Sequence, residues 1–292
     1  TVGATEASKD SAIAGVDAAV DAAVAAGAGA GDGGAAAQSF TLTTGVDNGA
    51  EFTGGAGDDS FIASAATAAT TTLTPGDSLT GGNGTDTLSI TASTAGGNTL
   101  GAGVTTSTIE SVSVNAVTAT TLDATLMSGV TDVFSNGSLA DLSVSNLAAI
   151  PNTHLVGTSS DTTIGISAAA TVGTSDEMTV ALSSAATAGN ANLTAQGIET
   201  FNVVASVASG SAAFSQTLTS STASSVVITG DASTNITVDL AGAGATAATT
   251  GSVTGNAAAN TMTVTADVAD FMSIDLQGGN DVLVLGAGIG AN

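Results

Sequence analysis

The chain has 292 residues, and its 25 acidic side chains face only one Lys or Arg and one His, which gives a formal net charge of −24. Such a surface excludes nucleic acid and anionic membranes as partners, because both are bound through clusters of Lys or Arg. The chain has no Cys, Trp or Tyr but 38 Gly, which excludes disulfides, thiolate metal sites and a thick aromatic core. Cations are therefore the expected partners.

The first predicted element is a helix over residues 8–26. Ile13, Val16 and Val20 recur at the spacing that places side chains on one face of a helix. A run of glycines that begins at Gly27 is expected to end the helix. Packing of this helix against a neighbour and a role as a terminal cap are both left open.

No segment of the sequence predicts membrane insertion. No stretch reaches the ~20 apolar residues of a membrane-spanning helix. Residues 1–6, Thr-Val-Gly-Ala-Thr-Glu, lack the basic and apolar regions of a signal peptide. The chain is therefore expected to be a mature or excised piece, or to have its export signal elsewhere.

From Phe40 onward, short alternating runs such as Leu88-Ser-Ile90 and Val112-Ser-Val114 replace the helical period. They predict strands of about 3 to 6 residues separated by Gly, Asn and Asp turns. With such small side chains, we expect an all-β chain that folds as a parallel β-solenoid (β-helix or β-roll) with a short N-terminal helix. A two-sheet sandwich is the structural alternative.

Degenerate repeats favour the solenoid. Residues 109–114, Ile-Glu-Ser-Val-Ser-Val, are echoed by residues 198–203, Ile-Glu-Thr-Phe-Asn-Val, and residues 229–232, Thr-Gly-Asp-Ala, by residues 254–257, Thr-Gly-Asn-Ala. A unit of turn and strand that is reused along a chain predicts stacked coils that bury each other's faces.

Two nonapeptides carry the sharpest functional signal. Residues 54–62, Gly-Gly-Ala-Gly-Asp-Asp-Ser-Phe-Ile, and residues 81–89, Gly-Gly-Asn-Gly-Thr-Asp-Thr-Leu-Ser, both match G-G-x-G-x-D-x-U-x, in which U is a large apolar residue. This is the repeat of calcium-binding β-rolls. Asp77 lies nine residues before Asp86 and keeps the register, whereas Asp281 belongs to a partial match near the C-terminus.

The spacing has a chemical reason. Glycine permits positive φ and close approach of the backbone, so that carbonyl oxygens can face a hard cation, and Asp adds charge. Because Ca²⁺ takes about six to eight oxygens, each ion is expected between the loops of successive coils. The predicted ligands are the carboxylates of Asp58, Asp59, Asp77, Asp86 and Asp281 and the backbone oxygens of Gly55, Gly57, Gly82, Gly84 and Gly279. A plain β-turn is the alternative for each loop.

Motifs of common enzymes are absent from the sequence. It has no Gly-x-Ser-x-Gly elbow, P-loop or His-Glu-x-x-His motif. His154 follows Pro151 closely and is interpreted as a turn residue. Paired carboxylates such as Asp176-Glu177 occur in glycosidases, but without Trp or Tyr the chain lacks the usual platforms for sugar stacking. We expect no enzymatic activity and no catalytic residue.

The nonapeptides, the two Ile-Glu phrases and the Thr-, Ala- and Gly-rich composition together resemble RTX proteins, and more narrowly the calcium-dependent S-layer proteins of Gram-negative bacteria. The resemblance implies bound Ca²⁺, type I secretion and a location outside the cell, at its surface. It divides the chain into an Ala-rich helix and Gly-rich linker (1–38), an RTX-like calcium-binding region (39–90) and a degenerate solenoid with a partial motif (91–292).

The resemblance implies a structural subunit, or a segment of one, in a self-assembling surface layer. Other copies of the chain are the implied partners, and cell-surface polysaccharide is a further candidate. A repetitive secreted RTX adhesin and the calcium-folded carrier region of a secreted enzyme are the alternatives. The nonapeptides are few, and residues 63–71 separate the best pair, so calcium is expected to bridge specific coils or subunits instead of filling a continuous row.

Overall fold

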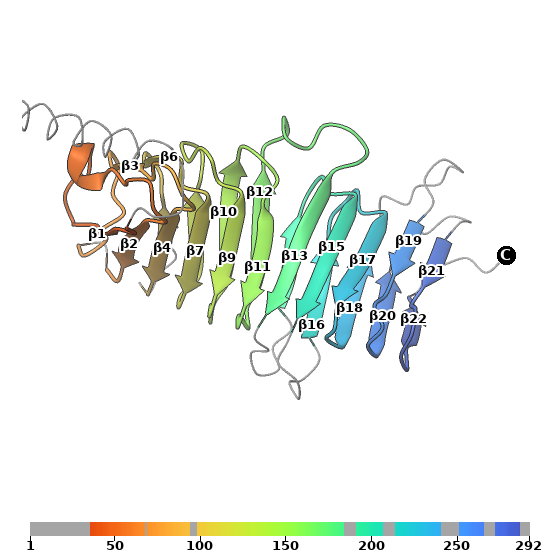
Figure 1. Ribbon diagram of the computed structural model, residues 1–292. Coiled ribbons are helices and arrows are strands. Elements are labelled where there is room, and N and C mark those ends of the chain that lie inside the picture. The colour runs from red at the N-terminus through yellow and green to blue at the C-terminus, as the bar shows by residue number, and fades with distance from the viewer. Residues whose placement is uncertain are drawn as a thin grey trace, which may run out of the picture.

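The computed structural model describes residues 36–67, 69–93, 98–183, 191–206, 214–240, 251–265 and 272–286. These residues form an all-β parallel solenoid with one short 3-10 helix, η1 (Gly49–Phe52) (Figure 1). The predicted solenoid is thereby confirmed, and the sandwich is excluded because the paired strands run parallel. The predicted helix over residues 8–26 lies outside the described residues.

The long sheet has 11 strands, in the order β1-β2-β4-β7-β9-β11-β13-β15-β17-β19-β21. Their bounds are β1 (Ser39–Thr41), β2 (Ser60–Ala65), β4 (Thr87–Ala92), β7 (Ser111–Ala116), β9 (Asp132–Asn136), β11 (Asn152–Val156), β13 (Glu177–Ser183), β15 (Thr200–Ser206), β17 (Ser225–Gly230), β19 (Gly251–Thr254) and β21 (Met272–Asp275). The chain returns to this sheet once per coil, which explains why its order follows the sequence.

A second sheet has nine strands, in the order β22-β20-β18-β16-β14-β12-β10-β8-β5. Their bounds are β5 (Asn98–Leu100), β8 (Thr120–Asp123), β10 (Leu142–Leu147), β12 (Thr162–Ile166), β14 (Ala191–Ala195), β16 (Phe214–Thr219), β18 (Thr234–Asp239), β20 (Asn260–Thr265) and β22 (Val282–Leu285). A short third sheet, β3 (Ser78–Thr80) and β6 (Thr105–Ser107), adds another side to the N-terminal coils.

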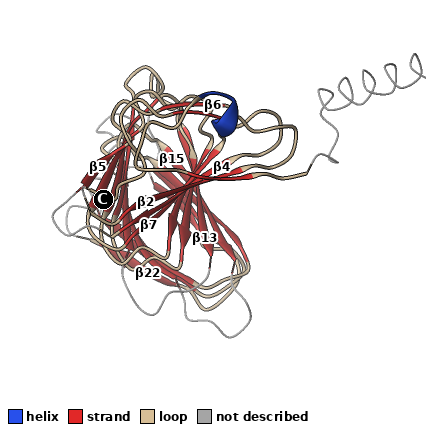
Figure 2. Cartoon of the chain, turned by 90° about the vertical axis from the view of Figure 1, so that its left-hand side faces the viewer, coloured by secondary structure: helices blue, strands red, loops and turns tan. Residues whose placement is uncertain are grey.

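Alternation of side chains places a narrow apolar core between the sheets. In β15, Phe201 and Val203 are fully buried, whereas Asn202 between them points outward and is partly exposed. Parallel, in-register pairing then stacks like on like, as with Phe61 opposite Leu88. Figure 2, which views the solenoid from its N-terminal side, shows successive strands fanning around a common axis, as expected from the twist of parallel strands.

The repeated phrases occupy equivalent places in different coils. Ile109 and Ile198 are fully buried at the corner that precedes the long sheet, and the Glu that follows each of them stands directly before β7 or β15. The prediction that a turn-plus-strand unit recurs in stacked coils is thus confirmed. The predicted boundary between residues 90 and 91 falls inside β4, which pairs with both β2 and β7.

Candidate metal centre

The two complete nonapeptides lie in neighbouring coils, one directly upon the other. Their loops, residues 54–59 and 81–86, lead into β2 and β4, which pair in parallel with Phe61 opposite Leu88. These two apolar residues are fully buried, as the motif predicted. The pairing brings the aspartates of the two motifs to equivalent positions in adjacent coils.

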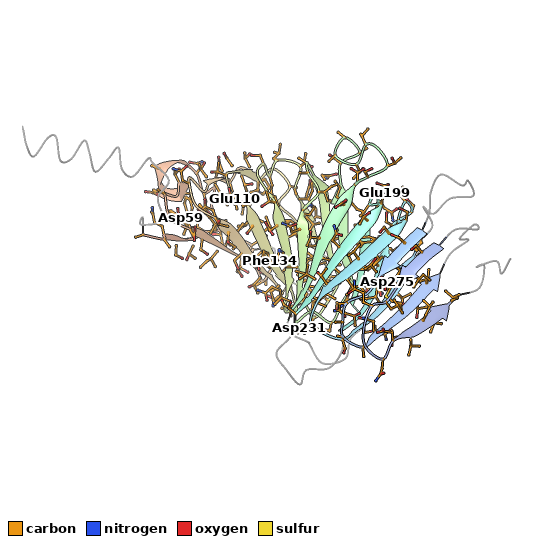
Figure 3. The ribbon with its side chains drawn as sticks, turned by 45° about the vertical axis from the view of Figure 1, so that its right-hand side comes forward. Asp59, Glu110, Phe134, Glu199, Asp231 and Asp275 are labelled. Carbon is orange, nitrogen blue, oxygen red and sulfur yellow. The ribbon has the colours of Figure 1, made fainter. Side chains whose placement is uncertain are left out.

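The acidic side chains at this corner form a ladder with the backbone. The N–H of Asp59 donates to Oδ1 of Asp86 at 2.7 Å, and the N–H of Asp86 donates to Oε2 of Glu110 at 2.8 Å. The N–H of Gln38 donates to Oδ1 of Asp59 at 2.6 Å. Each carboxylate therefore reaches back to the preceding coil. Figure 3 shows Asp59 and Glu110 on the same edge of the solenoid.

The two motif aspartates differ in one partner. Oδ2 of Asp59 accepts the N–H of Gly55 at 2.6 Å. In the next coil the equivalent N–H, that of Gly82, donates instead to Oγ1 of Thr108 at 2.8 Å. Asp86 is 0% exposed, and its Oδ2 has no hydrogen-bond partner. An unpartnered buried acceptor costs about 1 to 3 kcal/mol, and more when it is charged.

The charges around Asp86 are all of one sign. Burial raises the pKa of Asp86 above its ordinary value; the hydrogen bond from the N–H of Asp59 acts in the opposite direction, and the charges of Glu110, Asp59 and Asp58 raise the pKa further. The only Lys or Arg in the sequence is Lys9, which lies outside the described residues. Within the described residues no Lys or Arg reaches this oxygen, which leaves a proton, a water molecule or a cation from solution to satisfy it.

The glycines of the motif allow the coils to approach closely. A Cβ at Gly81 would overlap both the carbonyl oxygen of Thr108 and Oδ2 of Asp86, and a Cβ at Gly54 would overlap the carbonyl oxygen of Gly81. Any side chain at either position would push two coils apart. Glycine is therefore needed at these positions for steric reasons, and its small size lets backbone oxygens lie beside the Asp86 carboxylate.

The carbonyl oxygens of Gly55 and Gly57, two of the predicted backbone ligands, lie between the two loops. The carbonyl oxygen of Gly55 accepts the N–H of Asn83 at 2.9 Å, and that of Gly57 lies 2.6 Å from the place where Gly84 would carry a Cβ. Gly82 and Gly84 have φ values of +109° and +117°, which strongly favour glycine. Carbonyls of the first loop thus face the second loop, and a carbonyl oxygen that accepts one hydrogen bond retains a second lone pair.

Asp77 lies at a different corner from the other two aspartates of the nonapeptide region. It precedes β3, and its carboxylate accepts the N–H of Asp47 at 2.9 Å and the N–H of Thr74 at 2.6 Å. The carboxylate of Asp47 in turn accepts the N–H of Thr43 at 2.7 Å. Asp77 and Asp47 are 1% and 2% exposed. They form a second ladder, so Asp77 does not share a site with Asp59 and Asp86.

The remaining predicted ligands are Asp58, Asp281 and Gly279. Asp58 is exposed and accepts the N–H of Thr85 at 2.8 Å, which ties the first loop to the second. Asp281 precedes β22 in the last described coil, where its Oδ1 accepts the N–H of Asn260 at 2.8 Å. Gly279 has a φ of +122° and packs against the preceding coil. Asp281 and Gly279 are therefore separated from the nonapeptide loops by the length of the solenoid.

Glu110 and Asp47 were missed as candidate site residues. Glu110 follows Asp86 by 24 residues, and Asp86 follows Asp59 by 27, so spacing by one coil was the signal that could have found it. Among the residues that the structure describes, no three side chains of His, Cys, Asp or Glu are gathered so that they could hold a metal ion. A cation at this corner would therefore need backbone oxygens in addition to the carboxylates.

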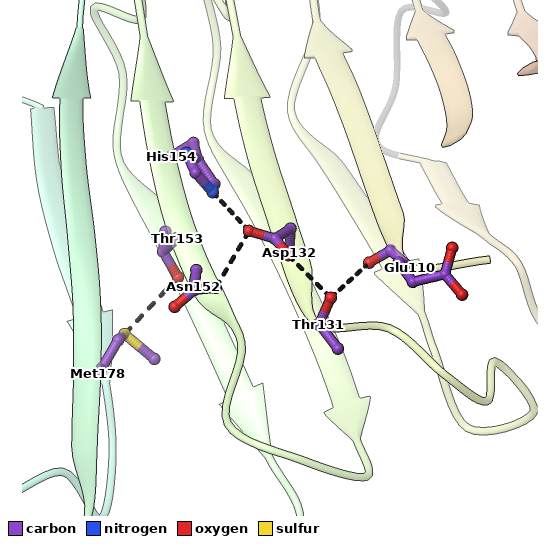
Figure 4. A network of polar contacts seen from close by, with 7 residues as sticks. All are labelled: Glu110, Thr131, Asp132, Asn152, Thr153, His154 and Met178. Atoms are coloured by element: carbon purple, nitrogen blue, oxygen red, sulfur yellow. Dashed lines mark hydrogen bonds and ion pairs between the residues drawn. The ribbon is translucent and has the colours of Figure 1, made fainter. Parts of the chain in front are cut away.

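His154 belongs to a separate polar network on the outer face of the long sheet (Figure 4). It lies within β11 and not in the predicted turn; its Nε2 is 2.7 Å from Oδ1 of Asp132, and its ring stacks on Phe134 at 4.0 Å. Burial acts to raise the pKa of Asp132, but the hydrogen bonds from His154, Thr131 and Asn152 outweigh it and hold that pKa below its ordinary value. The pair joins neighbouring coils.

No protein-family model matches the chain, and no match was found among the curated proteins or the solved structures. In the described part of the chain, no helix is long and apolar enough to span a membrane.

Proposed function

We propose that this chain is a calcium-binding structural subunit, or a segment of one, in a bacterial surface layer that resembles those built by RTX-type S-layer proteins. The observation that carries the proposal is the corner formed by the two nonapeptide loops. There the fully buried Asp86 has an oxygen without a partner, and the charges of Glu110, Asp59 and Asp58 surround it. The proposed role is structural and secreted, not enzymatic.

The groups at this corner fit a hard cation. Asp86 would provide the carboxylate oxygen that lacks a partner, Asp58 and Glu110 their charges, and Gly55 and Gly57 their backbone oxygens. Ca²⁺ accepts a flexible set of oxygen ligands at about 2.3 to 2.6 Å, whereas Mg²⁺ demands a small octahedral site and retains water. An irregular set of carboxylates and carbonyls therefore favours Ca²⁺, which would neutralise the acidic corner when bound.

The shape of the solenoid supports self-assembly. β21 and β22 are the last strands of their sheets in the described chain, so each has one backbone edge without a neighbouring strand there. All four residues of β22 are exposed, among them Leu283 and Leu285, which continue the buried column of Met262 and Val264. Open parallel edges of this kind accept further strands, either from the following coils of a longer chain or from another copy.

Calcium titration of the chain, followed by circular dichroism, light scattering and electron microscopy, tests the proposal. We expect β-structure and particle size to increase together at millimolar Ca²⁺, to reverse with chelator and to be absent with Mg²⁺. Asp86→Asn should weaken the calcium response, and the exposed Asp231→Asn, which makes the same change in charge on the opposite edge (Figure 3), should leave it unchanged.

The other outcomes identify the alternatives. A calcium-dependent gain of β-structure without growth in size would overturn the surface layer and favour an adhesin or a carrier region. Binding of the calcium-loaded chain to cells or polysaccharide would then indicate the adhesin. Absence of any calcium response would overturn the metal assignment itself.

A further inference from the structure

Among the described residues, an acidic arrangement occurs twice along the same edge of the long sheet, and only one copy is marked by a glycine nonapeptide. In both copies an Asp stands directly before one strand and a Glu directly before the next strand of the sheet. Asp86 and Glu110 precede β4 and β7, and Asp176 and Glu199 precede β13 and β15. We name each such pair an acidic step.

The two acidic steps have the same hydrogen bond. The N–H of Asp86 donates to Oε2 of Glu110 at 2.8 Å, and the N–H of Asp176 donates to Oε2 of Glu199, also at 2.8 Å. In each step the backbone carbonyl of the Asp accepts an N–H from the following strand, as Asp86 does from Ser111 at 3.0 Å. The side chain of the Glu therefore lies against the backbone of the coil that contains the Asp.

The two steps also have the same unsatisfied atom. Oδ2 of Asp86 and Oδ2 of Asp176 are both buried and have no hydrogen-bond partner. Asp86 is fully buried, and Asp176 is partly exposed at its other atoms. The recurrence matters because the second step has no Gly-Gly-x-Gly loop, so loop geometry alone does not create the unpartnered oxygen.

The negative charge of each acidic step favours a cation over a neutral hydrogen-bond donor as the partner of the free Asp oxygen. In each step the negative charge of the Glu carboxylate lies against the backbone N–H of the Asp, which brings a second negative charge to the same corner. Among the described residues the only basic side chain is His154, whose ring nitrogen is already 2.7 Å from Asp132. In such a corner a cation from solution can bind the free oxygen of the Asp and the second oxygen of the Glu.

A third carboxylate with an unpartnered buried oxygen shows the contrast. Oδ1 of Asp239 also has no partner. Its neighbours in register are Thr219 and Thr265, which are uncharged. Without a second carboxylate in the next coil, Asp239 does not form an acidic step.

We propose that the acidic step is a divalent-cation site in its own right and that the chain uses it twice, at Asp86 with Glu110 and at Asp176 with Glu199. The choice of Ca²⁺ as the ion rests on the proposed function, but the second site does not depend on the nonapeptides. The strands β9 and β11 lie between the two steps, so the sites are separate and should fill independently.

Calcium bound per chain, measured by equilibrium dialysis at millimolar Ca²⁺, tests this proposal. Glu199→Gln should lower the number of bound ions by one, and Glu110→Gln should do the same at the other step. Glutamine retains an oxygen that can accept the N–H of the Asp, so the hydrogen bond can persist while the charge is lost. The matched control is Glu177→Gln, which removes an exposed charge next to the second step and should bind as many ions as the wild type.

Circular dichroism of each variant verifies its fold, and Asp176→Asn, which should likewise lose one ion, replaces Glu199→Gln if that variant does not fold. A wild type that binds calcium together with a folded Glu199→Gln variant that binds just as much would overturn the second site alone. A wild type that binds no calcium would overturn both this proposal and the proposed function. Calcium binding at both steps without growth in particle size would support the acidic steps and overturn only the surface layer.

Discussion

Replacement of Asp86 by Asn should stabilise the chain in the absence of calcium and lose most of that advantage when calcium is present. In chelator near neutral pH, Oδ2 of the fully buried Asp86 has no hydrogen-bond partner, and the charges of Glu110, Asp59 and Asp58 act on it. Asparagine retains an oxygen for the N–H of Asp59 and removes the charge. An unpartnered buried group costs about 1 to 3 kcal/mol, and more when it is charged, so exchange of the carboxylate for a neutral amide should raise the free energy of unfolding by up to about that amount.

Calcium should reduce the difference in stability between the wild type and the variant. At a concentration about ten times the dissociation constant, each site adds ~1.4 kcal/mol to the free energy of unfolding of the wild type, and Asp86→Asn should lose this gain at its site. Thermal unfolding followed by circular dichroism can resolve the difference, since 1 kcal/mol corresponds to about 2 to 4 °C in domains of 150 to 250 residues. We therefore expect the variant to melt above the wild type in chelator and to lose most of this lead in calcium.

The exposed Asp231→Asn variant is the control for the change in net charge, and it should follow the wild type in both conditions. If Asp86→Asn were destabilised equally in chelator and in calcium, the carboxylate would serve only as a hydrogen-bond acceptor for the backbone. That result would refute the reasoning that links its free oxygen to a cation.

Three further predictions follow from the contacts. Gly81→Ala should destabilise the solenoid by about 1 to 3 kcal/mol or more in chemical denaturation, because its Cβ would overlap the next coil; Gly45→Ala, with its nearest contact at 3.6 Å, should change stability by less than about 0.5 kcal/mol. The pKa of Asp86 is raised in the folded state, so the folded chain binds this proton more tightly than the unfolded chain does. In chelator, the resulting stabilisation is present at low pH and is lost as pH rises through the folded pKa. A difference in the free energy of unfolding between wild type and Asp86→Asn that does not change with pH would contradict the assignment. The pKa of Asp132 is lowered in the folded state, so its carboxylate contributes stability that is lost as pH falls through the folded pKa. His154→Ala should raise the pKa of Asp132, as measured by NMR titration of the carboxyl group. An unchanged pKa would show that the ion pair has no effect.

Alternation and repeats were enough to predict the architecture. Runs such as Leu88-Ser-Ile90 became strands with their apolar residues inside, because a side-chain period of two leaves only one face for the core. The solenoid then followed from repetition, since the same turn and strand must find the same neighbours in each coil. The alternation could not reveal the short third sheet, because β3 and β6 contain three residues each.

The nonapeptides predicted that their loops belong to successive coils, but not which acidic side chains would lie together. Asp77 and Asp86 are nine residues apart and look equivalent in the sequence, yet the chain turns a corner between them. Partners are set by the coil length, which varies as loops shorten, from 27 residues between Asp59 and Asp86 to 24 between Asp86 and Glu110. Glu110 was hidden for this reason and because a longer side chain replaces Asp there.

His154 shows the same limit for a single residue. Its position shortly after Pro151 suggested a turn, but β11 begins at Asn152, directly after the proline. The preference of His154 for the strand comes from its neighbours in the adjacent coil, Phe134 and Asp132, which are about one coil earlier in the sequence. Local sequence does not contain that information.

Hydrogen exchange of the backbone amides, measured by mass spectrometry with and without calcium, tests the calcium-binding corner most directly. The account predicts slower exchange in calcium for peptides that cover residues 54–60 and 81–87, where N–H groups bond to the acidic ladder, with little change in magnesium. Peptides from β9 and β11 should change less, because opening free energies are local. Equal exchange with and without calcium at the nonapeptide loops would contradict the assignment of a cation to this corner.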